Sequence, residues 1–253
     1  MRVKLLNMYV DSVTMDEAID EIDNLIQKRN HSYVVTPNMD HIVVAEEDSL
    51  FKEVYDNASL VLTDGVPLLW IAKYLGTPIK EKVSGSDVFP KMCELSANKG
   101  YKVYILGAAE GVAAKAAENL RIKYPKLQIV GTYSPPVGFE KDDSNVNEII
   151  EMINSTQADI LAVALGSPKG EKFIYNIRNR VCVSLSISIG ATIDFEAGNV
   201  KRAPRWMSNI GLEWLYRVTQ DPVRLGKRYL KDIRMIFPII KKYKKIDSEN
   251  KEL

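Results

Sequence analysis

The 253-residue chain has little of what disulfide frameworks, metal clusters and membrane spans are built from. Its two cysteines and two histidines are too few for a disulfide framework, a zinc cluster or a histidine metal site. Both cysteines, Cys93 and Cys182, stand in apolar surroundings, which favours a reducing compartment. The chain contains no run of about 18 uncharged apolar residues, and Asp11 interrupts the N-terminal segment before an apolar signal core forms. We therefore expect a protein that is neither exported nor membrane-spanning.

Motifs of several common enzyme classes are also missing. The chain has no G-x-S-x-G nucleophile elbow, no G-x-x-x-x-G-K-[ST] phosphate loop and no D-x-D pair to hold a divalent ion on a nucleotide diphosphate. Gly107 and Gly111 form half of a dinucleotide-binding glycine loop, but residues 131–133 provide no acidic residue for the ribose. A nicotinamide dehydrogenase is therefore disfavoured. A diphosphate bound here has to be neutralised by cationic side chains.

Charge is divided unevenly along the chain, although the formal net charge is only +1. Residues 1–200 hold 20 Lys and Arg against 27 Asp and Glu, a net charge of −7. Residues 201–245 hold 13 basic and 3 acidic residues, a net charge of +10. A basic segment on an acidic body implies an anionic partner, such as lipid, nucleic acid or a phosphorylated substrate.

Short β-branched segments alternate with helical segments over residues 1–190. This alternation is typical of a parallel sheet covered by helices, so we predict an α/β fold with a Rossmann-like, largely parallel sheet and helices on both faces. A capping box of Thr14 and Glu17 predicts a helix over residues 15–28. A second helix is expected to follow Ser86 and to end at Gly100. The expected strands are residues 32–36, 59–63, 102–106, 128–130, 160–165 and 181–187.

After Gly198 the pattern becomes helical only, which predicts an α/β body over residues 1–198 and a helical, basic C-terminal appendage over residues 199–253. We expect helices at residues 203–219 and 222–245, the second interrupted at Pro238. The second helix is amphipathic: cations flank an apolar side. Two interpretations stay open, namely a helix packed on its own domain with a solvated basic face, or a helix that lies in a membrane interface. Its apolar residues are Leu225, Tyr229, Ile233, Ile236, Phe237 and Ile240.

Ligands of open parallel sheets bind beyond the carboxyl ends of the strands, so polar residues that follow expected strands are candidate site residues. Asp64 is either a helix cap or a general base in a partly desolvated cleft, and Asn38 can likewise cap a helix. Guanidinium groups suit a diphosphate because their planar forks bind it bidentately. The candidates after the strands are Thr36, Asn38, Asp64, Gly65, Gly107, Gly166, Pro168, Lys169 and Glu171. The candidate arginines are Arg202, Arg205, Arg217, Arg224 and Arg228.

A series of motifs in fixed order resembles those of the WecG/TagA/CpsF glycosyltransferases and spans nearly the whole chain. The chain looks most like the members that move N-acetylmannosamine from UDP onto undecaprenyl-diphosphate-linked N-acetylglucosamine in wall teichoic acid synthesis. The motifs are TPN at residues 36–38, TDG at 63–65, VSGSD at 83–87, GSPK at 166–169, KRAP at 201–204, GLEWLYR at 211–217 and PVRL at 222–225.

The resemblance implies an inverting, metal-independent transfer without a cofactor, by a cytoplasmic protein on the inner face of the plasma membrane. It implies that Asp64 is the base and that Thr36 and Asn38 line the site of the UDP-sugar. It also implies that the appendage closes over the active site with its arginines on the diphosphate. The body surfaces that the appendage covers can instead self-associate into a homo-oligomer.

One departure and three alternatives remain. Family members usually carry Gln where this chain has Gly170, so a side-chain amide is missing there. The chain could instead belong to a member that uses another UDP-sugar, or be a membrane-peripheral nucleotide-binding module without catalysis. A nucleic-acid binder is disfavoured, because the acidic body repels phosphate and residues 236–240 offer aliphatic side chains, with Phe237 the one aromatic, rather than a base-stacking platform.

Overall fold

Six parallel strands form the central sheet in the computed structural model, which describes residues 1–249. The strand order is β4-β3-β8-β7-β5-β6, and every neighbouring pair is parallel. The predicted Rossmann-like sheet is therefore confirmed. Its strands are β3 (Ser32–Val35), β4 (Leu60–Val61), β5 (Lys102–Gly107), β6 (Gln128–Tyr133), β7 (Ile160–Ala164) and β8 (Leu185–Ser188).

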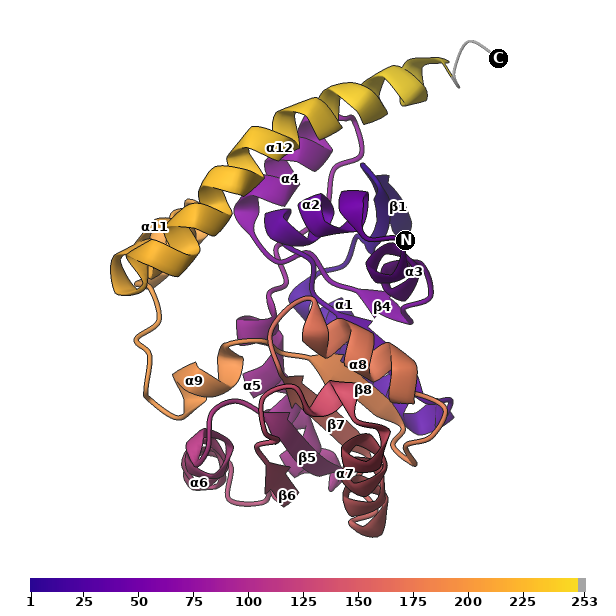
Figure 1. Cartoon of the computed structure of the whole chain (residues 1–253), viewed down its shortest axis with the longest axis vertical. Coiled ribbons are helices and arrows are strands. Elements are labelled where there is room, and N and C mark those ends of the chain that lie inside the picture. Colours follow the sequence, from indigo (N-terminus) through magenta and orange to yellow (C-terminus); the bar gives the residue numbers. More distant parts are fainter. Residues whose placement is uncertain (250–253) are drawn as a thin grey trace.

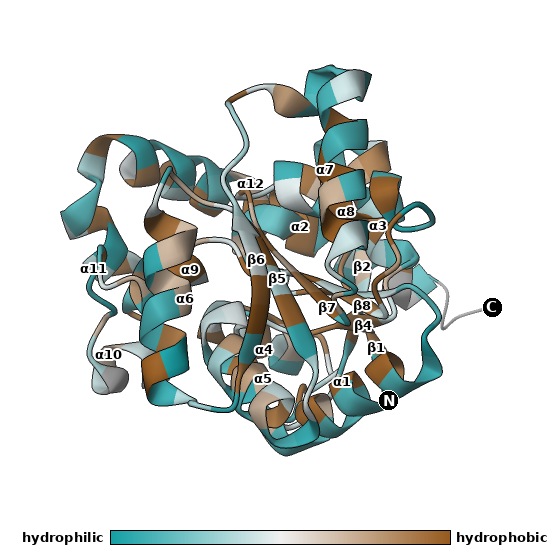
Figure 2. Ribbon diagram, turned by 90° about the horizontal axis from the view of Figure 1, so that it is seen from below, coloured by the Kyte–Doolittle hydropathy of each residue, from teal (hydrophilic) through white to brown (hydrophobic). Residues whose placement is uncertain are grey.

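Helices cover both faces of this sheet, as Figure 2 shows. Because successive side chains of a strand point to opposite faces, the aliphatic strands supply two apolar cores. Val163 of β7 joins one core and Ala162 the other. The first core packs on α2 (Met39–Glu47), α3 (Ser49–Asp56), α7 (Asp143–Ser155) and α8 (Lys169–Ile177). The second packs on α1 (Met15–Lys28), α5 (Gly85–Lys99), α6 (Val112–Lys123) and α9 (Thr192–Glu196).

The N-terminal part departs from the prediction in two places. An unexpected antiparallel hairpin pairs β1 (Arg2–Leu5) with β2 (Met8–Asp11). Its strands are only four residues long, too short for a clear alternation in the sequence. The Thr14 capping box of α1 is confirmed, but α5 begins at Gly85 after Ser84 rather than after Ser86, and it ends before Gly100 as expected.

The C-terminal helices also differ from the prediction. The single helix expected over residues 203–219 is wrong, because Gly211 adopts a φ of +76° and separates α10 (Arg205–Asn209) from α11 (Glu213–Gln220). The expected interruption at Pro238 is wrong as well, since α12 (Pro222–Glu249) continues through it. Both Arg234 and Pro238 are exposed, so the carbonyl group that loses its partner to proline can be hydrated.

The long helix α12 lies across the body over α2 and α4 (Val66–Tyr74) (Figure 1). Leu225, Ile236 and Ile239 of α12 are buried, and the two isoleucines join the first core. A short 3-10 helix, η1 (Phe139–Lys141), precedes α7. Within residues 1–249 no helix is long and apolar enough to span a bilayer. The packing of α12 on α2 places the basic appendage beside the carboxyl ends of the central strands.

Candidate active site

A cavity of about 550 Å³ opens at the carboxyl edge of the sheet. Its lining comes from the segments that follow β3, β4, β7 and β8, and from α11 and α12 of the appendage. This is the edge at which open parallel sheets bind their ligands. The predicted site residues in its lining are Thr36, Asn38, Asp64, Gly65, Gly166, Glu171, Arg217, Arg224 and Arg228.

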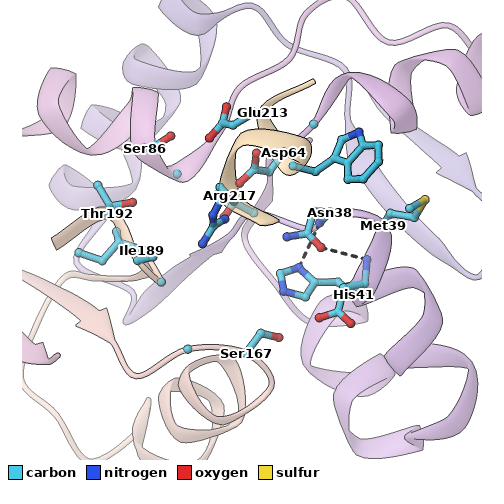
Figure 3. A pocket seen from close by; sticks show the side chains of 18 of the residues that line it. Asn38, Met39, His41, Asp64, Ser86, Ser167, Ile189, Thr192, Glu213 and Arg217 are labelled. Atoms are coloured by element: carbon cyan, nitrogen blue, oxygen red, sulfur yellow. Dashed lines mark hydrogen bonds between the residues drawn. The ribbon is translucent and has the colours of Figure 1, made fainter. Parts of the chain in front are cut away.

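Asp64 lies at the centre of the group that Figure 3 shows. Its backbone N–H donates to the Pro37 carbonyl at 2.8 Å, and its side chain is half-buried. The next residue, Gly65, has a φ of +112° and occupies the N-cap position of α4, where no side chain caps the helix. The interpretation of Asp64 as a helix cap is therefore wrong, and its carboxyl group is available to the cavity.

The environment of Asp64 makes this carboxyl group a suitable proton acceptor near neutral pH. Burial raises the pKa of Asp64 to about 6, and the negative charge of Glu213 adds to the increase. The cations Lys82 and Arg217 oppose it. Glu213 and Arg217 come from α11, so the appendage contributes charges of both signs beside the carboxyl group (Figure 3).

Thr36 and Asn38 follow β3. Thr36 is buried, and a side chain at Gly85 would place its Cβ 3.2 Å from Thr36 Oγ1. Asn38 is the N-cap of α2: its Oδ1 accepts from the Asp40 N–H at 3.0 Å, while its own N–H donates to His41 Nδ1 at 3.1 Å. The capping role is thus confirmed, and the same side chain also faces the cavity.

Glu171 on α8 presents an incompletely satisfied carboxyl group. Ser188 Oγ donates to its Oε1 at 3.0 Å, whereas Oε2 is buried without a hydrogen-bond partner. A buried acceptor of this kind can take a hydrogen bond from a substrate hydroxyl or amide. A side chain at Gly170 would place its Cβ 3.3 Å from Ser188 Oγ, so a larger residue there requires Ser188 to move by a few tenths of an ångström.

Four predicted site residues lie outside the cavity lining. Gly107 has to be glycine because a Cβ there would come within 2.5 Å of the Ala164 carbonyl oxygen. Lys169 turns to Glu140, with Nζ 3.1 Å from Oε1, and Pro168 precedes it at the N-cap position of α8. Arg202 bonds the carboxylate of Asp87 on α5. The side chain of Arg205 lies outside what the structure describes.

The three appendage arginines in the lining differ in their partners. Arg217 is half-buried. At both Asp64 and Asp194 burial raises the pKa of the carboxyl group, and the positive charge of Arg217 opposes that increase. Arg224 is exposed, and its Nε donates to Asp221 Oδ2 at 2.6 Å. Arg228 Nη1 lies 3.9 Å from Asp40 Oδ2. Together they form a cationic wall that can bind an anionic ligand.

Sequence reasoning missed several cavity residues. Lys82 lies in the loop between α4 and α5, where no strand end marks it, and it pairs with Asp87 at 2.9 Å. Asp87 is held ionised: Ser84, Lys82 and Arg202 hold its pKa at about 2 against the effect of burial. Glu213 stands in the quoted GLEWLYR motif, yet its like charge beside Asp64 becomes apparent only when α11 is placed on the body.

The raised pKa of Asp64 predicts an acidic limit to activity. If Asp64 has to be ionised to accept a proton, turnover should fall as the pH falls through about 6. Glu213→Gln removes a neighbouring negative charge and should move this acidic limb to lower pH. Glu110→Gln, an exposed carboxyl group after β5, should leave the limb in place. A pH–rate profile measures the limb, and coincident profiles for the Glu213→Gln variant and the unmodified protein would contradict the interpretation.

Arginines at the carboxyl edge of a parallel sheet suit the binding of a phosphorylated ligand. Residues 3–249 match the glycosyl transferase WecG/TagA/CpsF family. The chain belongs to this family, which makes it a glycosyltransferase.

The similar proteins include three bacterial enzymes, each named N-acetylglucosaminyldiphosphoundecaprenol N-acetyl-beta-D-mannosaminyltransferase. The protein of Bacillus subtilis strain 168 is 30% identical over 237 residues, 93% of this chain and 90% of the relative. That of Bacillus spizizenii is 29% identical over 226 residues, 88% of this chain and 86% of the relative. That of Staphylococcus aureus strain MW2 is 25% identical over 246 residues, 96% of this chain and 94% of the relative.

Proposed function

We propose that the protein transfers N-acetylmannosamine from its UDP donor to undecaprenyl-diphosphate-linked N-acetylglucosamine, with inversion at the anomeric carbon. The names of the relatives supply the sugar and the acceptor. The observation that carries the chemistry is the Asp64 carboxyl group, half-buried in the cavity, with a pKa of about 6, beside Arg217 of the appendage. A nucleotide-binding module without catalysis gives no reason for such a carboxyl group.

An inverting transfer is a single in-line displacement, and the cavity offers a group for each half of it. Asp64 accepts the proton of the acceptor hydroxyl as the hydroxyl oxygen attacks the anomeric carbon. The bond from that carbon to the UDP oxygen breaks on the opposite side, and negative charge grows on the diphosphate. Arg217, Arg224 and Arg228 neutralise that charge as it develops.

In this proposal guanidinium groups take the role that a divalent ion has in other glycosyltransferases. The appendage lines the cavity with three arginines, and the body adds Lys82. Within residues 1–249 no group of three or more His, Cys, Asp or Glu side chains is arranged to hold a metal ion. The three arginines of the cationic wall support binding of UDP through its diphosphate.

A lipid-linked acceptor requires the cavity to reach the bilayer surface, and we propose that α12 and α4 lie on the membrane. Phe237 and Leu230 of α12 are exposed, and so are Trp70 and Tyr74 of α4. Lys244 Nζ lies 4.3 Å from the Tyr74 ring centroid, which joins the two helices at their ends. Exposed aromatic and aliphatic side chains among cations are the pattern of an interfacial helix bound to an anionic leaflet.

This membrane orientation predicts that Phe237→Glu weakens binding to vesicles that contain anionic lipid. Burying one phenylalanine side chain contributes roughly 2 kcal/mol, so the apparent affinity should fall at least about tenfold. Val137→Glu is the matched control, because Val137 is fully exposed on the loop before α7, and it should bind as the unmodified protein does. Vesicle sedimentation measures both variants; equal losses would contradict the assignment of this face.

The proposed function is tested by incubating the protein with a panel of UDP-sugars and undecaprenyl-diphosphate-linked N-acetylglucosamine, with the product identified by mass. We expect UDP release that depends on the acceptor, and a product one N-acetylhexosamine heavier. UDP-N-acetylmannosamine should be used in preference to its N-acetylglucosamine epimer. Absence of acceptor-dependent UDP release with every donor would refute the proposal.

A further inference from the structure

Asp232 of α12 is a buried carboxyl group that the mechanism above does not use. Its side chain is fully buried, and neither carboxyl oxygen has a hydrogen-bond partner. Buried polar groups are nearly always hydrogen-bonded, because an unpaired one has lost the hydrogen bonds that it makes with water. A carboxyl group in this situation needs an explanation from its surroundings.

Two charged groups face Asp232. Arg228 stands four residues earlier on the same helix and therefore one turn away on the same side. Asp40, at the start of α2, lies across the contact between the two helices and lines the cavity. Arg228 Nη1 is 3.9 Å from Asp40 Oδ2, and Arg228 Nε is buried without a partner. The three groups thus form one cluster at the cavity wall.

The other charged and titratable groups nearby do not complete the cluster. Lys231 of α12 turns outward to Glu47 of α2, with Nζ 2.8 Å from Oε2. His41 of α2 is buried, and burial lowers its pKa, so it is held neutral. Glu171 faces His41 from α8 and bonds to Ser188. The cluster therefore holds two carboxyl groups for one guanidinium.

A single proton resolves this imbalance. Two carboxylates close together in a buried site cannot both be ionised at low cost, so one of them keeps its proton. Burial, with the negative charge of Asp40 added, raises the pKa of Asp232 to about 7. A protonated Asp232 can donate a hydrogen bond to Asp40, whose carboxyl group faces Arg228.

We propose that Asp232 and Asp40 share one proton and together hold the Arg228 guanidinium at the cavity wall, which makes Asp232 a positioning residue for the donor diphosphate. This inference rests on the proposed function, because the diphosphate of the donor is the anion that Arg228 meets. The shared proton also fixes α12 on α2.

The proposal gives donor binding a defined dependence on pH. Folding raises the pKa of Asp232. The protonated Asp232 carboxyl group therefore makes its full contribution to the free energy of docking α12 when the pH is below the pKa of an ordinary aspartate. It is lost as the pH rises through about 7. Affinity for a UDP-sugar, whose diphosphate keeps its charge over this range, should therefore fall as the pH rises through that value.

Binding of UDP-N-acetylmannosamine, measured by calorimetry in the absence of acceptor, tests the positioning role. Asp232→Ala and Arg228→Ala should each weaken binding about tenfold, and the double variant should bind no more weakly than either, because they remove one interaction. Asp232→Asn, whose amide can donate to Asp40 without a titrating proton, should restore most of the affinity and remove the dependence on pH. Lys231→Ala, the matched control at the same helix contact, should change the affinity less than about threefold.

Additive losses in the double variant, or an Asp232→Asn variant with the pH dependence of the unmodified protein, would overturn the proposal.

A second measurement needs neither substrate nor a destabilised variant. Infrared spectroscopy of the full chain without ligand should show a protonated carboxyl group at neutral pH that Asp232→Asn removes. If that signal is absent, the shared proton is refuted whatever the protein transfers, so this result is separate from the test of the proposed function.

Discussion

Replacing Asp64 with asparagine should lower the turnover of sugar transfer at least about a hundredfold, because a positioned general base contributes roughly 10² to 10⁴ in rate. The amide has nearly the same shape but cannot accept the acceptor's proton, so binding of the UDP-sugar should be largely kept. Steady-state rates with a water-soluble acceptor analogue measure the first effect, and calorimetry with the donor measures the second.

The matched control for this variant is Asp56→Asn. Asp56 ends α3 and pairs with Lys52 on the surface at 2.5 Å, so its loss should leave turnover unchanged. Turnover of Asp64→Asn within about threefold of the unmodified protein would remove Asp64 from the role of base, since such a loss is below what general-base catalysis contributes.

A chain truncated after Gly198 should lose sugar transfer altogether. We propose residues 199–253 as an appendage distinct from the α/β body, and the described part of it supplies Glu213, Arg217 and Arg228 to the cavity. The body keeps both faces of its sheet covered by α1, α2, α3, α5, α6, α7, α8 and α9, so we expect it to fold. Circular dichroism and thermal unfolding test the fold, and the transfer assay with a soluble acceptor tests activity.

Truncation also uncovers the part of α2 on which Ile236 and Ile239 pack, so a folded control is needed to separate loss of chemistry from loss of stability. Arg217→Ala keeps α12 in place and removes one cation from beside Asp64. It should lower turnover roughly tenfold or more, because a hydrogen bond to a charged group contributes about 1.5–3 kcal/mol. Full activity of the truncated chain would show that the appendage supplies nothing to the reaction.

The sequence was sufficient to predict the parallel sheet because its strands carry strong local signals, although β8 begins at Leu185 and not at residue 181 as expected. The segment of β7, Ile160–Ala164, is aliphatic throughout and buried on both faces, as a central parallel strand requires. The capping box at Thr14 likewise marked the start of α1. The hairpin of β1 and β2 was missed because four-residue strands that pair with each other carry little periodicity.

The cavity was predicted only where its residues follow strands. Asp64 and Thr36 could be found at strand ends, whereas Lys82 comes from a loop and Glu213 reaches Asp64 only through the packing of the appendage. The break at Gly211 was missed because its positive φ brings it against Val66 and Trp70 of α4, a contact between distant parts of the chain. Asp232 has no signal in the sequence that marks it, because its burial against α2 depends on the same packing.

We propose that a single carboxyl group works opposite guanidinium groups of the appendage, with no bound cation between them. The most direct measurement is the initial rate of sugar transfer by the full chain, after removal of divalent ions, in an excess of chelator. We expect an unchanged rate. A rate abolished by the chelator and restored by added Mg²⁺ or Mn²⁺ would contradict it.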